Sequence, residues 1–331
     1  MGDLLIDEVR RFDKCLANWR EGFFNLLVVR MVGLGDVMSC VVVTRALKRK
    51  YPESVITFYT SSSIEDFLKR FNWLYDVVSD GYEELSRIED QYDLTVDLRG
   101  VIDYLPWCDK APRIDLFARR LGVELEMEDY KFRFEASAEE KQFARDVFED
   151  KGRGKRKMIL SSNAQAEIRT WDLTLDFADV VSETFDVYLV HSKSVGFESE
   201  GVYDLGGLTT VGQLCGLVSE SDVLVTPDTG VMHLAGWMGK PFVSVFGPIP
   251  PQFRVGHFDK HIDLWRGDLE CAPCWDWQKC ACDIDKRFKA KTDIGHHWDN
   301  GFLIERVYKH CMKGITVEMV QEAVESLLGQ G

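Results

Sequence analysis

The sequence lacks any uninterrupted apolar run of about 18 residues, which is close to the minimum for a membrane-spanning helix. Its first 24 residues are charged throughout, and they lack the apolar core of a secretory signal. We therefore expect a cytoplasmic protein with no membrane span. Residues 1–24 are predicted to form an N-terminal extension ahead of the first strand, and peripheral association with the inner face of a membrane stays open.

Positive charge is also scarce. The 331 residues include 40 Lys and Arg against 55 Asp and Glu, which gives a formal net charge of −15. A nucleic-acid-binding protein needs a positive face, so this balance argues against nucleic acid as a partner. The nine cysteines of a chain expected in the cytoplasm are not predicted to form disulfides.

Short apolar runs alternate with helix-length segments through both halves of the chain. In the first half, strands are predicted at 25–30, 55–59, 75–78 and 94–98, an edge strand at 131–134, and helices at 36–50, 64–71, 116–121 and 138–150. In the second half, strands are predicted at 158–161, 187–190, 222–226 and 242–246, and helices at 174–184, 210–218, 229–238 and 316–328. Repeated strand–helix units predict an α/β fold with parallel sheets, whose ligands bind at the carboxyl ends of the strands.

A basic, glycine-broken stretch at 151–157 separates the two series of elements and is predicted to be a linker that packs against nothing. The length of the chain fits two domains. We therefore predict one domain at 25–150 and a second at 158–331, which includes a cysteine-rich segment at 271–311.

The first predicted strand ends in a tight turn, Gly33-Leu34-Gly35-Asp36. The two glycines allow a sharp bend and a close approach of ligand to backbone. Met38 replaces the third glycine of the dinucleotide fingerprint, which argues against a nicotinamide cofactor. Asp36, at the start of the following helix, is either a helix cap or a general base.

A second turn of the same kind follows the strand predicted at 222–226 and contains Asp228, Thr229 and Gly230, with His233 one helical turn later. A helix start of this type directs unpaired N–H groups at one point, which suits a phosphate. The alternative is simple capping, with His233 packed beneath the turn. Arg169, in the loop after the strand predicted at 158–161, could bind a diphosphate through its planar fork or could be a solvated surface residue.

The last quarter of the chain holds a group of cysteines. Cys271 and Cys274 form a C-x2-C pair, and Cys280, Cys282 and Cys311 follow. This spacing is typical of a structural Zn or Fe site. The alternative is a set of reduced thiols that pack a small loop.

In their order and spacing these motifs resemble glycosyltransferase family 9, the lipopolysaccharide heptosyltransferases that use ADP-heptose. The similarity runs from about residue 25 to the C-terminus. It is carried by the stretches 26–52, 92–100, 204–236 and 242–248 and by the cysteine-rich tail. The resemblance implies a GT-B architecture: two facing Rossmann-like domains with parallel sheets, an N-terminal acceptor-binding domain and a C-terminal nucleotide-sugar-binding domain.

The resemblance also implies roles for individual residues. Asp36 would be the catalytic base, and Arg169, the second predicted catalytic residue, stands where the family has a lysine. The donor-binding residues would be Asn163, Glu198, Asp228, Thr229, Gly230 and His233. Ala164 and Gln165 replace threonines that touch phosphate in the lipopolysaccharide enzymes, and Asp172 replaces the usual proline. Catalysis would be inverting and would require no metal or other cofactor.

A related branch that glycosylates autotransporters carries a four-cysteine iron site. By this similarity, Cys271, Cys274, Cys311 and either Cys280 or Cys282 are candidate ligands of a structural Zn or Fe. The predicted function is transfer of a sugar, heptose from ADP-heptose, to a hydroxyl of a lipopolysaccharide-type or other glycan or glycolipid. The alternatives are another nucleotide sugar, a protein acceptor, or a noncatalytic nucleotide-sugar-binding or assembly protein, and the oligomeric state stays open.

Overall fold

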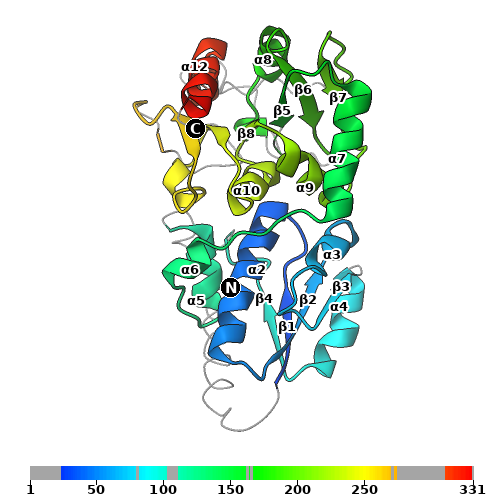
Figure 1. Ribbon diagram of the computed structural model, residues 1–331. Coiled ribbons are helices and arrows are strands. Elements are labelled where there is room, and N and C mark those ends of the chain that lie inside the picture. The colour runs from blue at the N-terminus through cyan, green and yellow to red at the C-terminus, as the bar shows by residue number, and fades with distance from the viewer. Residues whose placement is uncertain are drawn as a thin grey trace.

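Two parallel sheets divide the chain into two lobes, one above the other in Figure 1. The structure, a computed structural model, describes residues 24–79, 82–102, 111–161, 164, 167–269, 272–273 and 310–329. Both sheets contain only parallel pairings between these residues, which confirms the predicted α/β class. Within the same part of the chain, no helix has the length and apolar character needed to cross a bilayer.

The first sheet has the strand order β3-β2-β1-β4. Its strands are β1 Asn25–Val29, β2 Val55–Thr60, β3 Asp76–Ser79 and β4 Leu94–Asp97. Helices α2 Leu34–Lys50, α3 Ser62–Leu68 and α5 Arg113–Arg120 pack on one face, and α4 Tyr82–Ile88 lies on the other. Alternate residues of β1 point to opposite faces, as the period of a strand requires: Leu26 and Val28 meet α2, and Leu27 and Val29 lie on the face of α4.

The second sheet has six strands in the order β10-β9-β8-β5-β6-β7. They are β5 Arg156–Ser161, β6 Phe185–Val190, β7 Val202–Asp204, β8 Val223–Pro227, β9 Phe242–Phe246 and β10 His261–Trp265. Helices α7 Ala138–Lys151, α9 Val211–Glu220 and α10 Gly230–Trp237 cover one face. Helices α8 Thr174–Val181, α11 His310–Lys313 and α12 Val317–Leu328 cover the other. Short 3-10 turns lie at Glu89–Gln91, Glu167–Arg169 and Pro251–Phe253.

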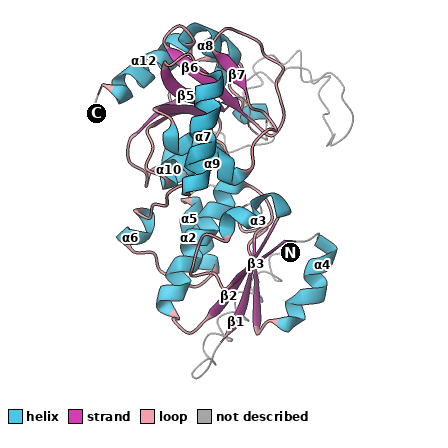
Figure 2. Cartoon of the chain, turned by 45° about the vertical axis from the view of Figure 1, so that its right-hand side comes forward, coloured by secondary structure: helices cyan, strands magenta, loops and turns pink. Residues whose placement is uncertain are grey.

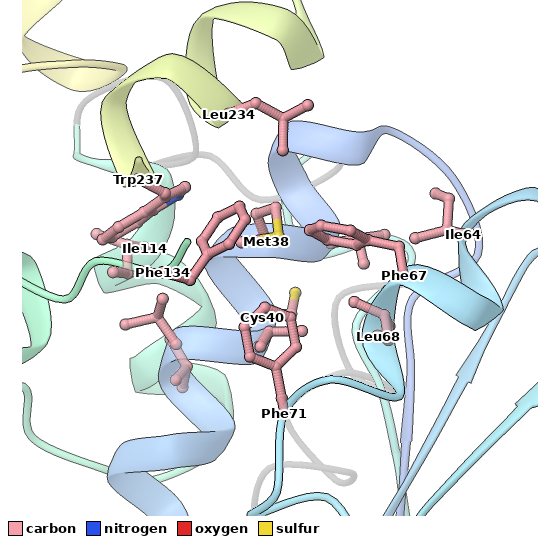
Figure 3. Packing of buried hydrophobic residues seen from close by; sticks show 14 of the residues in the cluster. Met38, Cys40, Ile64, Phe67, Leu68, Phe71, Ile114, Phe134, Leu234 and Trp237 are labelled. Carbon is pink, nitrogen blue, oxygen red and sulfur yellow. The ribbon is translucent and has the colours of Figure 1, made fainter. Parts of the chain in front are cut away.

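One hydrophobic cluster continues from the lower lobe into the upper lobe. Figure 3 shows Met38 of α2 and Phe67 of α3 beside Leu234 and Trp237 of α10, with Phe134 between them. These five side chains are buried. Apolar burial therefore joins the N-terminal half of α2 to α10.

The segment predicted as an edge strand at 131–134 is not a strand. It runs between the lobes as an irregular connection, and the backbone N–H of Phe134 donates to the carbonyl of Trp237 at 3.1 Å. Its alternating apolar residues, Phe132 and Phe134, pack against Phe71 and other aromatic side chains of the shared core instead of on a sheet. The prediction was wrong because an extended aromatic segment can bury its side chains without joining a ladder.

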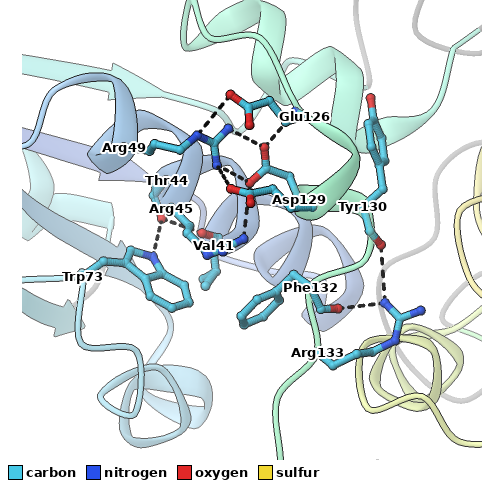
Figure 4. A network of polar contacts seen from close by, with 11 residues as sticks. Val41, Thr44, Arg45, Arg49, Trp73, Glu126, Asp129, Tyr130, Phe132 and Arg133 are labelled. Atoms are coloured by element: carbon cyan, nitrogen blue, oxygen red, sulfur yellow. Dashed lines mark hydrogen bonds and ion pairs between the residues drawn. The ribbon is translucent and has the colours of Figure 1, made fainter.

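The short helix α6 Met127–Tyr130 is tied to α2 by charge (Figure 4). Asp129 is fully buried and accepts hydrogen bonds from Arg49 at 2.8 and 2.7 Å and from Arg45 at 3.4 Å. A buried carboxylate is stable only when it is paired in this way. The network fixes the start of the connection that crosses between the lobes.

Helix α7 belongs spatially to the upper lobe, where it packs along α9 (Figure 2). The stretch predicted as a linker that packs nothing begins at the last residue of α7 and ends inside β5. In it, Arg153 donates to the buried carboxylate of Asp186 at 3.1 Å, and the N–H of Lys155 donates to the same group at 3.0 Å. The stretch is therefore anchored to β6, while the domain boundary drawn there stays a prediction.

The contact between α7 and α9 predicts a difference between two glycines one helical turn apart. A Cβ at Gly216 would lie 1.9 Å from the backbone oxygen of Glu140, whereas a Cβ at Gly212 would lie 2.4 Å from the side-chain carboxylate of Glu140 and 3.7 Å from Nη2 of Arg70. The Glu140 carboxylate is paired with Arg70, but a side chain can shift by rotation where a backbone oxygen cannot. We expect Gly216→Ala to lower the free energy of unfolding by about 2 kcal/mol, because the helices must move apart. Gly212→Ala, its control, should change this free energy by less than about 1 kcal/mol, because alanine also favours the helix. Urea denaturation measures both, and equal losses would contradict the packing described.

Candidate functional site

The N-termini of α2 and α10 meet where the two lobes face each other. A Cβ built on Gly35 would lie 2.2 Å from Cδ2 of His233, and a Cβ on Gly230 would lie 2.8 Å from Cβ of Leu34. These two positions therefore accept only glycine without rearrangement. Gly33, the N-cap of α2, has φ +82°, a left-handed conformation that glycine adopts at little cost. The two turns predicted separately form one site.

Asp36 lies in the first turn of α2 and is 6% exposed. Arg30 donates to its Oδ2 at 2.8 Å, and Arg113 donates to its Oδ1 at 2.6 Å. Burial by itself raises the pKa of this carboxyl, but the positive charges of Arg113 and Arg30 outweigh burial and hold the pKa below its usual value. Asp36 is therefore ionised at neutral pH.

Asp228 follows β8, before the first turn of α10, and is 3% exposed. Arg169 donates to its carbonyl oxygen at 2.9 Å and to its carboxylate at 3.3 Å, and Nε of Arg254 lies 3.8 Å from the same carboxylate. Burial opposes ionisation, yet Arg169 and Arg254 hold the pKa of Asp228 far below its usual range. Asp228 therefore fixes two arginines beside the helix N-terminus.

His233 is buried in the second turn of α10, with 4% of its surface exposed. Neither ring nitrogen has a hydrogen-bond partner among the described residues. Burial lowers the pKa of His233 to about 4, although Asp228 acts in the opposite direction. The ring is therefore neutral at pH 7 and has donor and acceptor capacity to offer to a ligand.

Positive charge exceeds negative charge in this cluster. Four arginines contact the two aspartates, which leaves an excess of two positive charges while His233 is neutral. Arg254 is 3% exposed, and burial together with the Arg113 charge lowers its pKa to about 9, so that it stays protonated at pH 7. An excess of this size beside a helix N-terminus suits a doubly charged anion.

Thr229 is the N-cap of α10, and its side chain makes no capping bond to the helix. Its hydroxyl lies 2.9 Å from the hydroxyl of Thr226. The first N–H groups of α10 are therefore not satisfied by this side chain, and the capping alternative considered for Thr229 is not what the structure shows. Together with Gly230, Thr229 forms the end of α10 that faces the arginines.

Glu198 is placed away from this cluster. It is exposed and lines a surface hollow with Lys151, Phe197 and Tyr203 beside the edge strand β7. Since β5 and β6 lie between β7 and β8, this hollow is about 14 Å along the sheet from β8, the strand that precedes Asp228. The structure therefore does not bring Glu198 together with the other donor-binding candidates.

The remaining candidates fall mostly outside the described residues. These are Asn163, Cys271, Cys274, Cys280 and Cys282. Cys311 is described and is buried in α11. Among the described residues, no group of three or more His, Cys, Asp or Glu side chains could hold a metal ion, so a metal at the cysteine cluster stays a prediction.

Arg30 and Arg254 were not predicted from the sequence as parts of this cluster, and Arg113 was predicted to have a different role. Arg30 directly follows β1, and Arg254 follows the 3-10 turn after β9. From the sequence alone, Arg113 is predicted only as one of several cations that could face a phosphorylated acceptor, with a solvated surface position as the alternative. The signal available for Arg30 was its position at the carboxyl end of a buried strand, where ligands bind in parallel sheets. Arg254 carries no such local signal.

Known proteins are similar to this chain in sequence and in fold. The profile of glycosyltransferase family 9 (heptosyltransferase) matches residues 112–283, more than half of the chain. A match with lipooligosaccharide heptosyltransferase 2 of Haemophilus influenzae is 32% identical over 68 residues, which are 20% of this chain and 20% of that protein.

Among solved structures, ADP-heptose lipopolysaccharide heptosyltransferase II of E. coli is similar with a TM-score of 0.62 and 16% identity, covering 92% of this chain and 99% of that one. A family 9 glycosyltransferase from Veillonella parvula DSM 2008 has a TM-score of 0.65 and 16% identity, with 93% and 98% covered. The iron-containing dodecameric glycosyltransferase TibC of enterotoxigenic E. coli H10407 also has a TM-score of 0.65, at 13% identity, with 92% and 78% covered.

The similar solved structures define the fold as a two-lobed α/β arrangement with the predicted GT-B architecture. The chain belongs to glycosyltransferase family 9. The resemblance stated from the sequence is thereby confirmed, together with glycosyl transfer as the class of reaction.

The buried neutral His233 predicts a specific pH dependence of folding. Its pKa is about 4 in the folded protein and about 6.5 when unfolded, so the unfolded state binds the proton more readily and stability falls as pH drops from about 6.5 to 4. We expect the loss of unfolding free energy between pH 7 and pH 5 to be about 2 kcal/mol smaller in His233→Gln than in the unmodified protein. Urea titrations at both pH values test this, and identical losses would show that His233 is not buried in its neutral form.

Proposed function

We propose that the protein is an inverting glycosyltransferase that moves a sugar from a nucleoside diphosphate sugar to an acceptor hydroxyl. The observation that carries the proposal is the arginine-rich cluster at the N-terminus of α10, with Asp36 of the opposite lobe against it. The leaving diphosphate needs positive charge and hydrogen-bond donors. The attacking hydroxyl needs a group that accepts its proton. Each lobe supplies one of these.

In this mechanism the upper lobe binds the donor. The N–H groups at the start of α10, with Arg169 and Arg254, hold the diphosphate and stabilise the charge that develops as the glycosidic bond breaks. Neutral His233 adds a hydrogen bond to the diphosphate or the sugar. Asp36 accepts the proton of the acceptor hydroxyl while the oxygen of that hydroxyl attacks the anomeric carbon of the sugar. The attack comes from the face opposite the leaving diphosphate, which inverts the configuration at that carbon.

The proposed donor is ADP-heptose. The heptosyltransferase family supports it, as do two similar solved structures: one is an E. coli ADP-heptose heptosyltransferase, and the other is TibC in complex with ADP-D-β-D-heptose. For the acceptor, we propose a lipopolysaccharide-type glycan, in keeping with the two relatives named as lipooligosaccharide and lipopolysaccharide enzymes. The described residues that we assign to the reaction are amide, guanidinium, imidazole and carboxylate groups, and catalysis through them needs no metal.

The role of Asp36 is tested by Asp36→Asn, which keeps the shape of the side chain and removes its basicity. We expect transfer of heptose from ADP-heptose to heptose-deficient lipopolysaccharide to fall at least about 100-fold, the usual contribution of a general base. Binding of ADP, measured by titration calorimetry, should not weaken, because Asp36 repels rather than holds the diphosphate. Turnover close to normal in a folded variant would remove Asp36 from this role.

The role of Arg254 is tested on binding alone. We expect Arg254→Gln to weaken ADP binding at least about tenfold, because a buried charge-assisted contact to phosphate is lost. Arg266→Gln is the matched control: Arg266 is paired with Asp268 near the surface, 2.6 Å away, and its loss should leave the affinity unchanged.

A thermal-shift comparison of ADP-, UDP- and GDP-sugars would identify the donor class, since a ligand of the native state raises the melting temperature. No shift with any of them would contradict the proposed function.

A further inference from the structure

The two arginines that hold Asp36 differ in how deeply they are buried. Arg30 donates through Nη2 to Asp36 Oδ2 at 2.8 Å, and through Nη1 to the carbonyl oxygens of Leu98 and Arg99 at 3.0 and 2.9 Å. Its side chain is 6% exposed and lies over the ring of Phe117. Arg30 therefore belongs to the rigid frame of the lower lobe, where it ties Asp36 to the end of β4.

Arg113 holds the other oxygen of Asp36 from the first residue of α5. Its Nη1 lies 2.6 Å from Oδ1, and its side chain is 19% exposed, about three times the exposed fraction of the Arg30 side chain. A long side chain that reaches from a helix start can turn about its own rotatable bonds without moving the fold. Arg113 is thus the more exposed of the two arginines that hold Asp36.

Arg113 is also close to the groups assigned to the diphosphate. Asp36 is adjacent to Gly35, which packs on His233 of α10. After burial, the charge of Arg113 is the strongest influence that lowers the pKa of Arg254, and it also acts on Asp228 and His233. A diphosphate at the start of α10 would compete with Asp36 for this guanidinium.

We propose that Arg113 exchanges partners when the donor binds: it holds Asp36 in the empty enzyme and turns to the donor diphosphate in the complex. Asp36 is then held by Arg30 alone and accepts a proton more readily. The basicity of Asp36 therefore increases only when the donor sugar is bound. This inference rests on the proposed function, since it takes the diphosphate to lie at α10.

The exchange makes a quantitative prediction for ADP binding, measured by titration calorimetry in a double-mutant cycle. In the unmodified protein ADP must draw Arg113 away from Asp36, so Asp36→Asn should raise the affinity about tenfold, the value of one charge-assisted hydrogen bond. In the Arg113→Gln background the same substitution should change the affinity less than about twofold. An equal gain in both backgrounds would overturn the proposal, because it would reflect only the loss of a negative charge.

Arg119→Gln is the control for net charge. Arg119 is an exposed residue of the same helix, and in its background the gain from Asp36→Asn should persist in full. If the unmodified protein binds neither ADP nor any other nucleotide, the proposed function is wrong. If it binds ADP but the cycle shows no coupling between Asp36 and Arg113, only the exchange is wrong.

A second measurement does not depend on the folding of Asp36→Asn. The charged and titratable groups that act on Asp36 are Arg30, Arg113, His233 and Arg254. If Arg113 leaves Asp36, ADP binding at pH 5.5 should take up more protons in the unmodified protein than in Arg113→Gln, as measured in buffers of different ionisation enthalpy. Because the charge of Arg113 also acts on His233, both proteins carry His233→Gln in this measurement, which removes the imidazole from the proton count. Equal uptake in the two proteins would overturn the exchange.

Discussion

The structure depends on the pairing of two buried carboxylates with a larger number of arginines where α2 and α10 meet. Asp36 and Asp228 come from different lobes, and each is held by two guanidinium groups. Removing either carboxylate leaves buried positive charge without compensation, which costs several kcal/mol in proteins. Four guanidinium groups around two carboxylates leave an excess of positive charge, which suits an anion such as the diphosphate of the proposed donor.

Glycine makes this meeting of charges geometrically possible. Gly35 and Gly230 lie at the first turns of the two helices, and a side chain at either position would overlap the opposite lobe. The helices can approach end to end only because both positions lack a Cβ. Gly35 and Gly230 therefore also determine how close Asp36 of one lobe lies to His233 of the other.

The sequence allowed the alternation of strands and helices, both turns and the family to be predicted, because each leaves a local pattern. It did not allow Arg254 to be assigned, because its pairing with Asp228 depends on how the turn after β9 packs back against β8. The segment at 131–134 was misjudged for a related reason: Phe134 bonds to Trp237 of the other lobe, and no pattern in 131–134 itself reports that partner. Local periodicity shows which residues are buried, but it does not show which residues they pack against.

The shared hydrophobic cluster limits how the two lobes can move. Trp237 and Met38 are fully buried between them, with Phe134 bridging. A hinge motion wide enough to expose Trp237 and Met38 would cost about 3–6 kcal/mol in lost burial, so a widely open form would be a minor population. Access to the cluster of arginines is then governed by small movements of side chains and connecting segments. Under the proposed exchange, the basicity of Asp36 depends more on whether Arg113 contacts it than on the separation of the lobes.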